Sequence, residues 1–301
     1  MSVLSEPPDI TPALQIFQIA TIAEQLAVTM YENAVANAAT LGLTDIDLAI
    51  ITAAGIEEQI HQEFFTSVIA LLSGAPAPVT YGPTTFSFPF GAATFTDLPT
   101  FIATQQALEG VFDSAFLAAI RELSHQEQHR AAQIAGQIAC IESEHRALGR
   151  DIALRHGISS IPDPVAALIT GVLNPTPSNP QPNPIPSTPP DNWAFAPVFL
   201  ESVADAPTLI QTAGFLSPTT DNTYTYQAID FTAPAYAPVY ANIFFREPTI
   251  NLGPSPSTTP PTPPTPPTPP TPPTPPPFHH HHHHRSPWWR NFGKNGGSWP
   301  L

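Results

Sequence analysis

The chain is poor in charged residues, in cysteine and in long apolar runs, and each shortage narrows what it can be. Only 11% of its 301 residues are charged, and 9 Lys and Arg stand against 24 Asp and Glu, a formal net charge of −15. Such an acidic chain is ill suited to nucleic acid or to an anionic membrane surface. The single cysteine, Cys140, excludes a disulfide within the chain and leaves its compartment open. No stretch reaches about 18 uninterrupted apolar residues, and no signal peptide is visible, so neither a membrane span nor export is predicted.

Apolar residues and prolines are abundant instead. Hydrophobic residues make up 42% of the chain, and there are 41 prolines, a combination typical of a compact core joined to irregular segments. We predict a helical domain at 12–155, an irregular extension with short helices and strands at 156–251, a Pro/Thr-rich linker at 252–277, and an unfolded tail at 278–301. The six-histidine run of the tail is either a purification handle or the product of a shifted reading frame, and it enters no functional argument.

Four amphipathic helices are predicted in the first domain, at about 12–41, 45–73, 98–123 and 125–155. Thr11, Thr44 and Ser124 are the expected N-caps of the first, second and fourth helices. Asp47 and Glu127 lie three residues after two of them and predict capping boxes. The proline-rich stretch between the second and third helices predicts a long crossover, which distinguishes this fold class from a simple up-down bundle.

The irregular extension carries weaker signals. We predict a short helix at 163–173 and another within 197–214. Residues 222–246 alternate in part and are rich in aromatics, which predicts extended structure.

Two E-x-x-H motifs carry the chemistry that we expect. Glu58 and His61 lie in the second helix, and Glu142 and His145 lie in the fourth. A spacing of three residues puts both side chains of a motif on one helix face, where they can reach the same cation. One such motif is weak evidence, because Glu and His often recur at this spacing on solvated faces.

The first and third helices supply matching carboxylates. Glu24 precedes Glu58 by 34 residues, and Glu109 precedes Glu142 by 33. In an antiparallel hairpin, residues equidistant from the turn lie at the same height. The midpoint between Glu24 and His61 falls at 42.5, on a predicted turn, and that between Glu109 and Glu142 falls at 125.5, beside another. The six side chains are therefore expected to lie at one level of the bundle.

Charge explains why they would need cations. The flanking positions on these helix faces are mostly apolar, and carboxylates buried on apolar faces are costly unless they are paired or metal-bound. Two divalent ions would supply four positive charges against four carboxylates, and two imidazoles would complete the ligand set. Other candidates are weaker: we place Glu57 and Glu63 in solvent or just behind the ligands, Cys140 in core packing, and Tyr31 in packing or beside the site. His125 and His129 belong by spacing to the first turns of the fourth helix.

These motifs resemble the ferritin-like superfamily, and more closely its desiccation-related, stress-associated members. The similar stretches span about residues 12–155 and are IEEQIHQEFF, FPFGAATFTDLPTFIATQQALEGVF and AAQIAGQIACIESEHRALGRDI. The resemblance implies an all-α, ferritin-like four-helix bundle with the long crossover between helices 2 and 3. It also implies that Glu58 and Glu142 bridge two metals, that Glu24 and Glu109 are terminal ligands, and that His61 and His145 each hold one metal. Many relatives of this kind are exported.

Three functions remain open from the sequence. In the first, the chain is a redox enzyme in which ferrous iron at a two-iron site is oxidised by dioxygen or peroxide. A manganese catalase-like reaction at two manganese ions is the alternative, since carboxylate and imidazole ligands suit both metals. In the second, the metals only hold together a non-enzymatic stress or desiccation protein. In the third, the Pro/Thr-rich linker displays the domain as an interaction module, and deletion of 252–301 would abolish its localisation or its partner binding. The expected partners are metal ions and dioxygen or peroxide, and a homo-oligomer stays open.

Overall fold

The computed structural model describes residues 11–76, 81–158, 160–161, 185–186, 200–246 and 248. All of them belong to one compact unit, Met1–Leu252. The predicted helix at 163–173, the linker at 252–277 and the tail at 278–301 lie outside the described residues, and the predicted domain boundaries remain predictions.

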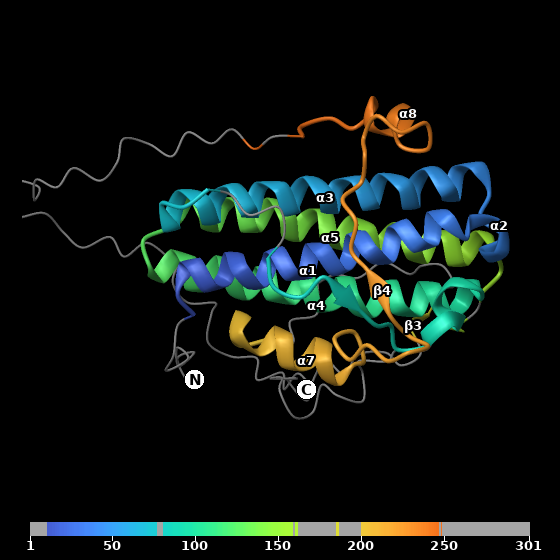
Figure 1. Ribbon diagram of the computed structural model, residues 1–301, viewed down its shortest axis with the longest axis horizontal. Helices are drawn as coiled ribbons and strands as arrows, with labels where there is room; N and C mark the ends of the chain where they lie inside the picture. Colours follow the sequence, from blue (N-terminus) through green and yellow to red (C-terminus); the bar gives the residue numbers. More distant parts are fainter. Residues whose placement is uncertain are drawn as a thin grey trace, which may run out of the picture. The chain divides into compact units, whose positions relative to one another are not determined.

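Four long helices form a bundle (Figure 1). They are α1 (Ala13–Ala36), α3 (Asp45–Ser73), α4 (Leu98–His125) and α5 (His129–Arg155). α1 packs mainly against α3, and α4 packs mainly against α5, with further contacts between α1 and α4 and between α3 and α5. Short connections join the two pairs internally, and a crossover of more than twenty residues joins α3 to α4. The predicted all-α bundle with one long crossover is confirmed.

Local cap chemistry explains several of these ends. The Thr44 side chain accepts a hydrogen bond from the Asp47 backbone N–H, and the Asp47 carboxylate accepts one from the Thr44 backbone N–H, so the predicted capping box is present. Asp97 caps α4 in the same way through the N–H of Thr100. Gly42 follows the short helix α2 (Ala38–Leu41) with φ of 71°, a left-handed conformation that favours glycine.

Two predicted caps are wrong. The N-cap of α1 is Pro12, not Thr11, whose hydroxyl instead forms a hydrogen bond with Ser202 of the extension. Ser124 lies within the last turn of α4 and donates to the carbonyl of Ile120, and Glu127 lies between the helices with φ of 60°. α5 therefore begins about four residues later than predicted, without a side-chain cap. Tertiary and helix-end contacts compete with local signals for the same hydroxyl groups.

The extension packs on several faces of the bundle. It contains η2 (Val203–Asp205), α7 (Ala206–Thr212), β4 (Tyr224–Thr225) and α8 (Ala237–Tyr240). α7 packs against α4, while α8 packs against α3. In Figure 1 the segment between β4 and α8 crosses the bundle to reach the α3 side. Extended structure was predicted for 222–246, but only β4 is a strand there, and the helical prediction for 197–214 holds from Val203 to Thr212.

The extension also holds the crossover in place. β4 pairs antiparallel with β1 (Thr85–Phe86), and the 3-10 helix η1 (Gly91–Phe95) follows in the crossover. The Phe88 ring packs edge-on against Phe215 and Tyr224. A second strand pair joins β2 (Ser160–Ile161) to β3 (Ile185–Pro186), within a region predicted to be irregular.

One described helix, α1, is long and apolar enough to span a membrane by length and composition alone. Of its most apolar stretch, 67% is buried inside the protein. Core helices of water-soluble bundles meet the same criterion, so this is weak evidence for a span.

Candidate metal centre

All six predicted ligands meet in the middle of the bundle. Each long helix contributes one glutamate, Glu24 from α1, Glu58 from α3, Glu109 from α4 and Glu142 from α5, and all four are fully buried. His145 is 2% exposed, whereas the His61 side chain retains 13% exposure. The level predicted from the hairpin midpoints is the level at which they lie.

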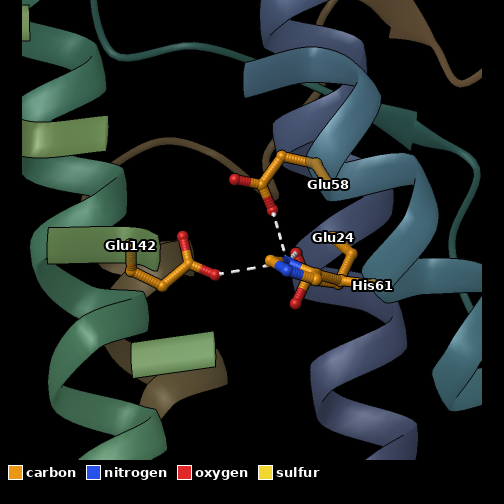
Figure 2. A group of neighbouring side chains, drawn as sticks. All are labelled: Glu24, Glu58, His61 and Glu142. Carbon is orange, nitrogen blue, oxygen red and sulfur yellow. Dashed lines mark ion pairs between the residues drawn. The ribbon is translucent and has the colours of Figure 1, made fainter. Parts of the chain in front are cut away.

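The six residues form two overlapping groups. Glu24, Glu58, His61 and Glu142 offer ligand atoms within 4.8 Å of one another, and so do Glu58, Glu109, Glu142 and His145. Glu58 and Glu142 therefore belong to both groups. Figure 2 shows the first group, with Glu58 and Glu142 both directed at the His61 ring.

The two shared glutamates turn one oxygen toward each histidine. Glu58 Oε2 lies 3.6 Å from His61 Nδ1, and Glu58 Oε1 lies 2.8 Å from His145 Nδ1. Glu142 Oε1 lies 3.7 Å from His61 Nδ1, and its Oε2 lies 3.6 Å from His145 Nδ1. By contrast, Glu24 lies 3.9 Å from His61 and Glu109 lies 3.7 Å from His145. Glu58 and Glu142 thus have an oxygen available to each group, whereas Glu24 and Glu109 each belong to one.

Buried atoms without hydrogen bonds test whether the cluster fits cations. Seven of the eight carboxylate oxygens of the four glutamates, and Nδ1 of both histidines, make no hydrogen bond of acceptable geometry. Nδ1 of His145 is close to Glu58, but it is not well aligned for a bond. Buried polar atoms are normally paired, and an unpaired set usually marks a missing ion or water. Nine convergent oxygen and nitrogen atoms of this kind suit divalent iron or manganese.

Electrostatics point the same way. Burial and the nearby charge of Glu58 hold the pKa of Glu24 and of Glu109 well above the usual range. Burial would lower the pKa of His145, but contacts with Glu142, Glu57 and Glu58 raise it. Without cations, the cluster can reduce its repulsion only by taking up protons.

Neighbouring side chains orient His145. Glu57 Oε2 lies 2.8 Å from Nε2 of the ring, which leaves Nδ1 facing the cluster. The Gln105 side-chain amide donates to the backbone carbonyl of His145 at 2.6 Å. A histidine ligand held through its other nitrogen has a defined ring orientation and tautomer. Glu57 was predicted to lie either in solvent or just behind the ligands, and its contact with His145 places it behind the ligands.

Tyr31 lies beside the cluster. Its hydroxyl donates a short hydrogen bond to Glu109 Oε1, the one carboxylate oxygen of the set that has a partner, and its ring packs edge-on against His145. Tyr31 also lies close to the backbone of α3, because Gly55 faces it there and has no Cβ. A Cβ added to Gly55 would lie 2.9 Å from Tyr31 Cβ. Its spacing from Glu24 indicated proximity, but the choice between packing and a polar contact needed the fold.

Three other expectations meet different outcomes. Cys140 was expected in the core, but it is exposed, because it lies on the outer face of α5. His125 ends α4 rather than opening the fourth helix, and His129 is the first residue of α5. Glu63 is exposed, which is the first of the two placements expected for it.

A comparison with known families agrees with this arrangement. A family model described as a ferritin-like domain matches residues 13–155, from the first residue of α1 to the last of α5, and so includes all six side chains. No curated protein and no solved structure gives a significant match. Residues 13–155 of this chain are therefore a ferritin-like domain.

Proposed function

We propose that the chain binds two iron ions, or alternatively two manganese ions, as a protection against oxidative stress. With iron, dioxygen or peroxide would be reduced by electrons from ferrous iron, which becomes ferric; with manganese, two molecules of hydrogen peroxide would be converted to water and dioxygen, which needs no other reductant. The observation that carries the proposal is the set of nine buried, converging ligand atoms without hydrogen bonds. Glu58 and Glu142, which belong to both groups of ligand atoms, would help to hold both ions. Glu24 with His61 would hold one, and Glu109 with His145 the other. Iron or manganese in such a site supplies the redox chemistry that the protein side chains lack.

The side chains in and around the cluster exclude water from it and fix the orientation of the ligands. All four glutamates are buried, so electrostatic interactions among them are little screened by solvent. Glu57 and Gln105 hold His145, while the Tyr31 hydroxyl holds Glu109. Only His61 reaches the surface, which makes its side of the cluster the point of entry for a small oxidant.

Metal content and oxidant consumption together test the proposal. The full chain is loaded anaerobically with Fe(II) or Mn(II), analysed for metal, and then given dioxygen or peroxide. We expect two equivalents of metal and consumption of one oxidant, and the metal that supports the faster reaction identifies the ion. The double variant Glu58→Ala/Glu142→Ala should lose both metal and reaction, whereas Glu144→Ala, an exposed glutamate on the same helix as Glu142, should keep both.

A different result would favour the structural alternative. If the metal-loaded protein consumes neither oxidant, yet metal raises its melting temperature, the ions only stabilise the bundle and the proposed redox function is wrong.

A further inference from the structure

A cavity of about 320 Å³ opens between α3 and α5, next to His61. Its walls are single helix faces: Glu57, Ile60, His61 and Phe64 of α3 and Ile134, Gln137, Ile138 and Ile141 of α5. Both sets follow the spacing i, i+3, i+4, i+7 of one helix face. Residues 243–246 and Pro248 of the extension form its remaining wall. The volume is at the small end of the range of roughly 300–1,000 Å³ that is usual for small-molecule sites.

The cavity is apolar along most of its surface. Five of its lining residues are isoleucines, and Phe64 adds an aromatic ring to the same wall as His61. At the rim, Phe244 is 82% exposed, which is unusual for a phenylalanine. A lining of this kind favours a ligand with an apolar body.

Glu57 and Arg246 both line the cavity, but only Glu57 is paired with an ionisable side chain among the described residues. Glu57 is already engaged by His145 at 2.8 Å. Arg246 makes no ion pair with any described carboxylate, and its guanidinium group is positioned by the carbonyl of Ile243, at 2.8 Å from Nε, and by the Tyr240 ring, at 4.1 Å. Nη2 of Arg246 also donates to the carbonyl of Ala241 at 3.5 Å, and the remaining guanidinium N–H groups have no partner among the residues that the structure describes. A pre-positioned guanidinium group with such donors suits a carboxylate.

We infer that this cavity binds a small carboxylic acid with an apolar tail, the tail lying along the isoleucine walls toward His61 and the carboxylate lying on Arg246. The inference concerns binding alone, so it does not depend on the redox function proposed above. It places an organic molecule beside the only ligand of the cluster that reaches the surface.

Calorimetry on the metal-free full chain tests the inference, with octanoate as the probe and octan-1-ol as its uncharged counterpart. We expect one octanoate site per chain and weaker binding of the alcohol. Arg246→Gln should weaken octanoate binding by roughly ten-fold or more, since a charge-assisted hydrogen bond is lost. Arg121→Gln, on α4 and outside the cavity, should change it less than about two-fold.

A second variant tests the apolar walls. Ile243→Trp adds bulk to the cavity from the extension, which spares the bundle, and should reduce octanoate binding by at least ten-fold. Ile46→Trp makes the same change at an exposed position on α3 and should have no effect. The inference is overturned if octanoate does not bind, if the alcohol binds equally well, or if either cavity variant binds like the wild type. Metal analysis of the same preparations separates the two proposals. Metal binding without octanoate binding would refute only the proposed cavity ligand, and octanoate binding without metal binding would refute only the proposed metal centre.

Discussion

The shared position of Glu58 predicts a graded loss of metal. Glu58 belongs to both groups of ligand atoms, whereas Glu24 belongs to one. Replacing Glu58 with Gln should therefore weaken both metal sites, and replacing Glu24 with Gln should weaken one. We expect about two equivalents of metal in the wild type, one in Glu24→Gln, and less than one in Glu58→Gln.

Thermal stability gives the same prediction a magnitude. An ion present at about 100 times its dissociation constant stabilises the folded state by about 2.7 kcal/mol, so two ions contribute about 5 kcal/mol. In a domain of this size, 1 kcal/mol shifts the melting temperature by about 2–4 °C. Adding metal should then raise the wild-type melting temperature by roughly 10–20 °C, that of Glu24→Gln by about half as much, and that of Glu58→Gln hardly at all.

Two controls test whether the loss of stabilisation comes from lost metal binding. Glu144→Gln should respond to metal like the wild type, because Glu144 is exposed. Metal-free Glu24→Gln should melt no lower than the metal-free wild type, since burial and the charge of Glu58 already disfavour a charged carboxylate at Glu24. Scanning calorimetry with and without metal measures both. A wild-type metal response in Glu58→Gln would refute the shared-ligand reasoning.

Two further predictions concern the scaffold. Gly149→Ala should lower the free energy of unfolding by about 1–3 kcal/mol, because the new Cβ would lie 2.2 Å from the Gln105 side-chain oxygen. Gly136→Ala, where the new Cβ makes only an ordinary contact, should be nearly neutral, and urea unfolding measures both. The pKa of Asp47 is lowered, because hydrogen bonds, led by that of His156, outweigh the effect of burial. A lowered folded-state pKa adds stability that is present above the unfolded pKa of about 4 and is lost as the pH falls below it. Urea unfolding of Asp47→Asn between pH 6 and pH 3 should show a smaller acid loss than the wild type; an equal loss would contradict this assignment.

Local patterns were enough to predict the helices and the level of the cluster. The Thr44–Asp47 capping box depends on residues three apart, and hairpin symmetry depends only on the positions of the turns. Both kinds of information are contained in short stretches of sequence, where the helical repeat dictates which side chains share a face. The same local reasoning failed at Thr11 and Ser124, because each hydroxyl found another partner.

Pairs far apart in the chain required the tertiary structure. Glu57 and His145 are 88 residues apart, and whether Glu57 faces solvent or the imidazole depends on how α3 is rotated against α5. The contact of Tyr31 with Glu109 depends in the same way on the packing of α1 against α4.

The sequence by itself determined four helices with an acidic and imidazole-bearing level, because the 3.6-residue period and the turn positions place those side chains on inward faces. Only the tertiary structure decided which glutamate oxygen faces which histidine nitrogen in the cluster. It alone also decided that the extension packs back on the bundle and lines a cavity beside His61. These outcomes depend on the rotation and spacing of packed helices, which are set by the whole core rather than by any local stretch.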